Sequence, residues 1–418
     1  MQLSFELICG LVLAVSSPSN LPSAPAVDGD ACRRISSPGT AARCAVRRSP
    51  VLEVAASELD AARARRERAK IVLPSNPTVD LLVAGRRGAT DRDVNVYGTL
   101  RQEVEIGGQR RRRMGVADAE LEQGRADATT ERRKVAAVAV DVYYQVLVAQ
   151  RRADELTHAL EVARALERLA GERADAGVIA GLERDLARAA LIVVERRVLD
   201  TRRERDRARA HLAAAMGSSA TDLVITGSLT PPVLNAAAQP RPELASASAR
   251  VRAQDRRTAV LRRERLPNPA FIAVLQRDGF GELVAGGGVS MGIPLPSPLG
   301  HTAKAEIAHS RALVRRLRAD EALTKRRIAV EVESASSDLA GRRETVALYD
   351  VEATTSARAS LDALAEAMAA GQLDLRSALM AQQTLLELLQ GQLEAEYELC
   401  ISTVTAAVAT GADIEGWR

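Results

Sequence analysis

Apolar residues recur with two different periods along the chain, and the changes of period divide it into helices and strands. Between residues 51 and 73 they follow one helical face, which Pro74 ends because proline cannot continue a helix. Runs at 78–84 and 93–106 favour strands joined by a turn. The pattern predicts a helix followed by a β-hairpin.

A very long helix follows this hairpin. The helical pattern runs without proline from Gln109 to about Ala176, which corresponds to roughly 100 Å at the standard rise per residue. No globular domain of this size buries such a helix, so coiled-coil packing is expected. Gly177 predicts a tight reversal, after which a helix returns to Met216.

The second half of the chain repeats this order. Pro50 and Pro77 are separated by as many residues as Pro242 and Pro269, and a second reversal glycine, Gly371, falls at nearly the same offset. Agreement at both ends of the unit indicates a duplication of helix, hairpin, very long helix, reversal and closing helix.

The second unit contains strand-like runs at 271–275 and 285–294, and a charged helix is expected from about His301. The unit closes with a helix over residues 373–409. Apolar residues along it step by alternating four and three positions, as in a heptad seam that includes the polar Gln382.

The domain organisation follows from these elements. Residues 1–27 resemble a weak export signal, because an apolar run is present but no basic residue precedes it. There is no apolar run of the length that a transmembrane helix needs, so a membrane-spanning chain of this sequence must use strands. The remaining expected parts are an irregular segment at 28–49 with a short helix around Thr40–Arg48, a first repeat at 50–217, a linker at 218–240, a second repeat at 241–410 and a C-terminal tail at 411–418.

Composition supports long helices and excludes several functions. Charged residues make up 27% of the chain and aromatic residues 2%, a profile of coiled coils rather than compact enzymes. The net charge of +4 is small and Arg alternates with Glu, so no nucleic-acid partner is expected. No nucleophile–base constellation, metal-ligand spacing or phosphate-binding loop is found. We therefore expect a protein that is not an enzyme and has no cofactor.

The four cysteines, Cys9, Cys32, Cys44 and Cys400, lack metal-ligand spacing. Cys32 and Cys44 are able to pair in an oxidising compartment, but two reduced thiols are the favoured interpretation. Tyr143 and Tyr144 are expected to pack between helices rather than to bind a ligand.

Several short motifs occur in a fixed order along the chain. They are Asn76-Pro77 and Asn268-Pro269 before the hairpins, Glu105-Ile106-Gly107-Gly108-Gln109-Arg110 at the start of the long helix, Val140–Tyr144, Ala176-Gly177, Arg241–Leu244 and Ala370-Gly371. Together they resemble the TolC-like outer-membrane efflux proteins over about residues 40–409. The motif at the start of the long helix is most similar to the heavy-metal cation branch, of the CzcC or CusC type.

This resemblance implies a mainly α fold with β structure, built as a homotrimer. Two hairpins per subunit would form a twelve-stranded transmembrane β-barrel, and the long helices would form a hollow α-barrel across the periplasm. The implied function is an outer-membrane exit duct for heavy-metal cations or small toxic compounds. Its partners would be a periplasmic adaptor, an inner-membrane pump of the RND type and outer-membrane lipid.

The resemblance also assigns roles to particular residues. The reversals Gly177-Val178 and Gly371-Gln372 would form the periplasmic tip that contacts the adaptor. Family members carry aspartates shortly after the second reversal, where this chain has Ser377 and Met380. The candidate aperture carboxylates are therefore Glu183, Asp185 and Asp374, which are otherwise ordinary solvated groups near helix starts. Asn76, Pro77, Gly107, Gly108, Asn268 and Pro269 would mark the hairpin boundaries.

Two features at the membrane end are weaker. Only Tyr97, Phe271 and Phe280 are available for an aromatic girdle. Arg110–Arg113 follow a strand that should end near lipid headgroups, so they are either an ordinary charged helix start or a contact for anionic lipid phosphate.

Three alternatives remain open. The same architecture would serve type I secretion or drug efflux. A soluble coiled-coil scaffold would explain the helices but not the two proline-bounded hairpins. A degenerate relative that conducts poorly would explain the weak export signal and the missing aspartates.

Overall fold

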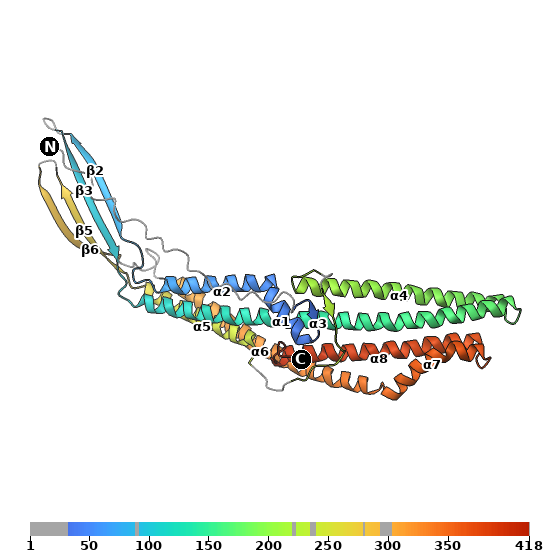
Figure 1. Cartoon of the computed structure of the whole chain (residues 1–418). Helices are drawn as coiled ribbons and strands as arrows, with labels where there is room; N and C mark the ends of the chain where they lie inside the picture. Colours follow the sequence, from blue (N-terminus) through green and yellow to red (C-terminus); the bar gives the residue numbers. More distant parts are fainter. Residues whose placement is uncertain are drawn as a thin grey trace.

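The computed structural model describes residues 32–87, 92–219, 223–234, 240–278, 281–292 and 303–417. The molecule is long and narrow, with a four-stranded sheet at one end and helices along the rest (Figure 1). The expected export segment, the second helix start at His301 and Phe280 lie outside the described residues.

The order of elements repeats, as the sequence predicts. The helices are α1 (Pro38–Arg48), α2 (Pro50–Ala69), α3 (Gln109–Asp175), α4 (Gly181–Ala215), α5 (Pro242–Glu264), α6 (Lys304–Ala347), α7 (Val351–Ala369) and α8 (Leu375–Thr410). The strands are β1 (Arg34–Ile35), β2 (Thr78–Arg87), β3 (Arg92–Glu103), β4 (Val224–Ile225), β5 (Pro269–Arg277) and β6 (Leu283–Met291). A hairpin therefore follows both α2 and α5.

The two hairpins join into one antiparallel sheet of order β2-β3-β5-β6. Because directly paired residues point to the same side of a sheet, the register assigns each side chain to a face. One face is almost entirely apolar, and its members are Val79, Leu81, Val83, Val94, Val96, Leu100, Phe271, Ala273, Leu275, Leu283, Ala285, Val289 and Met291. We call these residues the apolar sheet face.

The opposite face of the sheet is more polar. It carries Asp80, Asn95, Thr99, Arg101, Gln276 and Ser290 beside apolar residues such as Leu82, Ile272 and Val274. On the apolar sheet face, the charged residues that the structure describes are at strand ends, namely Arg87, Arg92 and Arg277. The sheet is thus amphipathic across its thickness.

Next to the sheet, four helices form a layer in which α3 contacts α2 and α5, and α5 contacts α6. We call the end of the molecule that carries the sheet the upper end. α3 runs through the full helical length (Figure 1). In the half away from the sheet, α4 and α8 lie beside α3, while α6 runs on along α8 and is followed by α7. The lower part of α3 packs against α4, α7 and α8 through residues such as Leu156, Leu166 and Ala170. The expected coiled-coil role of the long helix agrees with this packing.

The second very long helix is interrupted, which the sequence pattern does not predict. α6 ends at Ala347 and α7 begins at Val351. The Asp350 side chain accepts a hydrogen bond from the Glu352 amide at 3.2 Å and so caps the new helix. Tyr349 lies against α8 at Gly391, where an added Cβ would be 2.6 Å from its hydroxyl oxygen. The break therefore accommodates the half-buried Tyr349 ring without any proline or glycine at the break itself.

Residues 32–48 and 411–417 pack into the middle of the molecule, although 28–49 were expected to be irregular apart from a short helix, and 411–418 to be a tail. β1 pairs in parallel with β4, and α1 follows it. Ile414 and Trp417 are buried in the same cluster as Ile35. Helix α1 contacts the tail closely, because an added Cβ at Gly39 would be 1.9 Å from the Trp417 carbonyl oxygen.

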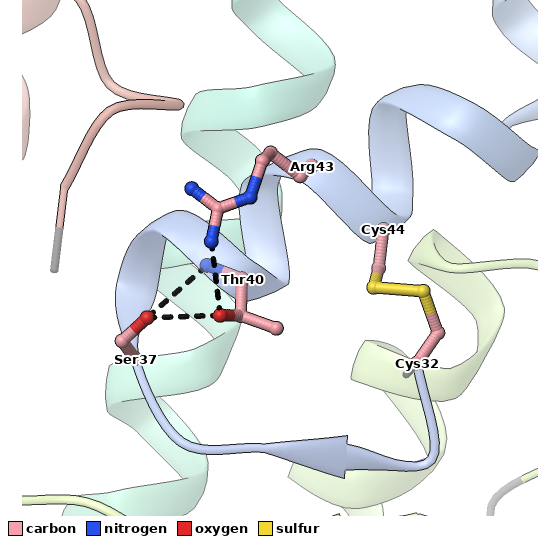
Figure 2. The surroundings of a disulfide bond; sticks show 5 residues. All are labelled: Cys32, Ser37, Thr40, Arg43 and Cys44. Atoms are coloured by element: carbon pink, nitrogen blue, oxygen red, sulfur yellow. Dashed lines mark hydrogen bonds between the residues drawn. A yellow bond between two sulfur atoms is a disulfide. The ribbon is translucent and has the colours of Figure 1, made fainter. Parts of the chain in front are cut away.

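The expectation of reduced thiols at Cys32 and Cys44 is wrong, because the two form a disulfide. Figure 2 shows the bond linking Cys32, two residues before β1, to Cys44 in α1. Near it, Ser37 Oγ accepts a hydrogen bond from the Thr40 amide at 3.3 Å and caps α1. The bond could not be predicted because the sequence separation of two cysteines does not determine the distance between their side chains.

Tyr143 and Tyr144 pack between helices as predicted, and they also hold the linker. Their rings meet edge to face, and their hydroxyls donate to the carbonyls of Thr226 and Thr230, both at 3.1 Å. Burial raises the pKa of Tyr143 to about 12. Gly227 (φ 148°) passes so close that a Cβ there would be 2.1 Å from the Tyr143 hydroxyl oxygen.

Among the described helices, none combines the length and the apolar character needed to cross a membrane.

Candidate functional site

The two helix reversals have the same backbone geometry and lie at the same end of the molecule, opposite the sheet (Figure 1). Gly177 and Gly371 adopt φ values of 70° and 72°, in the left-handed region that favours glycine. In each, the following amide donates to a carbonyl five residues earlier, Val178 to Arg173 at 2.8 Å and Gln372 to Ala367 at 2.9 Å. This is the Schellman arrangement that ends helices.

Sequence analysis did not identify Arg173, which joins the two reversals. Its guanidinium, on α3, donates to the carbonyls of Met368 and Ala369 at the C-terminal end of α7. Carbonyls at a helix end have no intrahelical partner and attract cations. One side chain therefore couples the α3–α4 tip to the α7–α8 tip. An arginine one turn before a reversal glycine was the only available signal.

The three candidate carboxylates occupy different environments. Asp374 caps α8, with its Oδ1 accepting from the Ser377 amide at 3.2 Å, and hydrogen bonding by Ser377 lowers the pKa of the Asp374 carboxyl. Asp185 lies 4.0 Å from the Arg184 guanidinium, and Glu183 is exposed in the first turn of α4. Their geometry within one chain does not gather them into a cluster. An aperture role therefore stays a prediction that depends on other subunits.

The hairpin boundary is a hydrogen-bonded junction between the two repeats. Asn268 accepts from the Gln109 side chain at 2.7 Å and donates to Glu103 at 2.8 Å. The Val104 amide donates to the Pro269 carbonyl at 3.0 Å. These contacts connect the end of β3, the start of α3 and the start of β5. The junction fixes the angle at which the sheet leaves the helices.

The remaining boundary residues shape this junction in other ways. Gly108 (φ 69°) is the N-cap of α3. Gly107 leaves room for the Gln109 side chain, because a Cβ there would be 2.9 Å from it. Asn76 and Pro77 are exposed in the link between α2 and β2. The duplication in sequence is therefore not matched by equal contacts of Asn76 and Asn268.

No group of three or more His, Cys, Asp or Glu residues is placed to hold a metal ion within the described part of the chain. Cys400 is buried in the central core, and burial raises the pKa of its thiol to about 12. A thiol that stays protonated is a poor nucleophile and a poor metal ligand.

Residues 43–218 match the family model of the outer membrane efflux proteins. The OprN outer-membrane channel is 23% identical and covers 90% of each chain with a TM-score of 0.70. This chain has the fold of the outer-membrane efflux channels. The resemblance to TolC-like proteins that the sequence indicates is therefore confirmed.

Two further solved structures agree over almost the whole length. The CmeC outer membrane channel of Campylobacter jejuni is 17% identical, with a TM-score of 0.75, and covers 91% of this chain and 86% of its own. CusC, whose description refers to transmembrane channel formation, is 14% identical, with a TM-score of 0.74, and covers 90% of this chain and 92% of its own. No curated protein matches the chain.

Proposed function

We propose that the chain is the outer-membrane exit duct of a tripartite efflux system and works as a homotrimer. The observation that carries this proposal is the apolar sheet face. Its large side chains are exposed, for example Val79 at 73%, Leu81 at 72% and Leu283 at 67%. A row of exposed aliphatic residues on one side of a sheet is what contact with lipid requires.

The sheet also has two edges, β2 and β6, without a neighbouring strand in the order β2-β3-β5-β6. Unpaired edges are costly in lipid, and closure into a barrel removes them. Three copies of this sheet joined edge to edge would give the twelve strands of the proposed barrel. The more polar face would then line the lumen.

We propose the helical tips as the place where a periplasmic adaptor and an inner-membrane pump of the RND type couple to the duct. Support comes from the exposure of Val178 (69%) and Leu182 (71%) beside the first reversal. In a trimer, Glu183, Asp185 and Asp374 would each be present three times near the aperture. Residues 50–217 and 241–410 would be the two repeats that supply its helices.

For the substrate, we propose heavy-metal cations, on the resemblance of the Glu105–Arg110 motif. Export through the duct would be passive and downhill, with energy coupled at the pump and no catalytic step in this chain. Efflux of other toxic compounds through the same fold is the second candidate. A strain that lacks its own duct distinguishes them, because resistance returns only to the substrate class that is exported.

The first test is membrane fractionation of the tagged full-length chain in a Gram-negative host, followed by native mass determination in detergent. A trimer in the outer-membrane fraction is the expected result. A soluble monomer or dimer, from correctly processed protein, would contradict the duct and favour the coiled-coil scaffold.

A further inference from the structure

An arginine-lined pocket lies between α3 and α5, immediately below the sheet. Its volume is about 480 Å³, and its arginines are Arg111 and Arg112 from α3 and Arg256 and Arg263 from α5. No carboxylate lines it. A second hollow of about 570 Å³ adjoins it and adds Arg262 and Arg265.

The position of these arginines is unfavourable without an anion. The first turn of α3 contains no acidic residue, although the positive end of the helix dipole lies there. Two of its four arginines are satisfied within the chain, because Arg110 donates to the Lys70 carbonyl at 2.9 Å and Arg113 pairs with Glu105. Arg111 and Arg112 make no ion pair within the described residues. The arginines of α3 and α5 around this pocket repel one another because their charges are alike, so a bound anion would stabilise this arrangement.

One wall of the pocket is preformed. The Arg256 guanidinium donates to the Gly115 carbonyl, which holds this side chain across α3. Gly115 makes the position available, since an added Cβ would be 3.4 Å from Arg256 Cδ. An arginine fixed by one hydrogen bond keeps its other donors for a ligand.

The pocket faces away from the concave side of the helical layer. A larger cavity of about 1000 Å³ is lined by α2, α3, α5 and α6 together, through residues such as Val116 and Leu261. Side chains from all four helices line one cavity only on the concave face of the layer, where they converge. On α3 this cavity is lined by Arg113, Val116, Ala117 and Glu120. At about 100° per residue, Arg111 and Gly115 lie on the opposite side of the helix from the middle of that set, and Arg112 lies between the two sides. In a closed ring of helices, the pocket would therefore face outward.

We propose that this pocket binds a phosphate group, through Arg111, Arg112, Arg256 and Arg263. Guanidinium groups form bidentate hydrogen bonds with phosphate oxygens. The backbone amides of the first turn of α3 add further hydrogen-bond donors. The pocket directly follows the strands that we propose to span the membrane, so the headgroup of an anionic phospholipid is one source and free phosphate the other. Only the headgroup source depends on the proposed function.

The test is a ³¹P NMR titration of the full-length chain in a phosphate-free maltoside detergent. The probes are inorganic phosphate and a short-chain phosphatidylglycerol, each added alone and then in competition. We expect at least one probe to bind saturably, and the double variant Arg111→Gln/Arg263→Gln to bind it at least about tenfold more weakly, since it loses two charge-assisted pairs. Binding should also weaken with salt.

The matched control is Arg125→Gln/Arg168→Gln, which removes two exposed arginines from α3 outside the pocket and changes the net charge equally. Arg112→Gln serves as the second pocket variant. Lipid binding that phosphate cannot displace assigns the headgroup, and displacement by millimolar phosphate assigns a free anion. Equal binding by wild type and both pocket variants, or no saturable binding of either probe, overturns the proposal. Failure of outer-membrane fractionation would contradict the duct but leave this result intact.

Discussion

Ala303 has an unfavourable backbone conformation for its residue type. Its φ is 52°, and among the described residues it is the one non-glycine with positive φ. It occupies the N-cap of α6, as Gly108 (φ 69°) does for α3. An L-residue in this region costs roughly 1–2 kcal/mol because its Cβ crowds the following carbonyl. The second repeat thus retains the turn of the first without its glycine.

Replacing Ala303 with glycine should therefore stabilise the fold. We expect Ala303→Gly to raise the free energy of unfolding by about 0.5–1 kcal/mol, the strain being partly offset by the flexibility of glycine in the unfolded chain. The matched control is Ala305→Gly inside α6, which should lower stability by up to about 1 kcal/mol. Thermal unfolding in detergent measures both, and a lower midpoint for Ala303→Gly would contradict the expectation.

Asp374 makes the second tip sensitive to pH. Because its folded-state pKa is lowered by hydrogen bonding from Ser377, the cap contributes fully above the ordinary carboxyl pKa. This contribution is lost as the pH falls through the lowered folded-state pKa. In that pH range, amide hydrogen exchange at the start of α8 should be faster than the intrinsic pH dependence of exchange predicts. Asp374→Asn retains a capping side chain without a titrating group, so an identical response in that variant would refute this account.

At the scale of elements, Arg173 should determine how firmly the two tips are joined. We expect Arg173→Met to raise hydrogen exchange in the last turn of α7, because the Met368 and Ala369 carbonyls lose their donor. The free energy of global unfolding should change little, since these Arg173 hydrogen bonds lie at one end of the molecule. Arg168→Gln, on the same helix, is the control. Unchanged exchange in Arg173→Met would mean that the tips are held by apolar packing alone.

The disulfide should stabilise the middle of the molecule. Cys32→Ser/Cys44→Ser is expected to lower the free energy of unfolding by about 2–4 kcal/mol, since the bond restricts the unfolded chain. The effect should spread to the C-terminal tail, because α1 packs against Trp417. A reducing agent should lower the unfolding temperature of the wild type and leave the double variant unchanged. Equal sensitivity of both would assign the effect to something other than this bond.

Element types and their order were predictable, because long periodic runs and prolines produce strong signals. The four hairpin strands, α3 and both reversals lie within a few residues of their predicted positions. The α6–α7 break was not predictable, since Leu348-Tyr349-Asp350 contains no helix-breaking residue and Tyr349 contacts Gly391, which is distant in the sequence. β1 and β4 were missed as a pair because a two-residue parallel ladder depends on tertiary contacts.

The candidate site was predictable only where backbone geometry decides it. Reversal glycines carry a local signal, so Gly177 and Gly371 could be found from the sequence. Arg173 and the Asn268 bridge depend on partners far away in the chain, at Met368 and Glu103. The periodic pattern of apolar residues gives no information about contacts between residues so far apart in the sequence. The sequence also suggested that Asn76 and Asn268 are equivalent, although their contacts differ.

At the scale of the whole molecule, polarity changes from one end to the other. The helical half has buried cores formed from Leu, Val and Ala, with charged residues outside. The sheet reverses this arrangement, since its large apolar residues are exposed, most of them on the apolar sheet face. An exposed apolar face of this extent is typical of a surface that contacts lipid or another protein. In the proposed duct, the junction at Asn268 would separate a part in lipid from a part in water.

This reversal predicts opposite outcomes for two adjacent residues of β5. Leu275 is on the apolar sheet face, beside Gly98 and Ala285, whereas Gln276 is on the polar face beside Tyr97. A lysine facing lipid near the membrane midplane costs about 2–4 kcal/mol, and one facing a wet lumen costs little. Leu275→Lys should therefore reduce the folded trimer in the outer membrane, while Gln276→Lys should leave it near the wild-type level. Quantitative membrane fractionation measures the amount of trimer for both variants. They form a matched pair because each introduces one lysine, at adjacent positions of β5. If Gln276→Lys is the more damaging variant, the lipid-facing and lumen-facing sides are reversed, and the outward direction of the arginine pocket must be reconsidered with them.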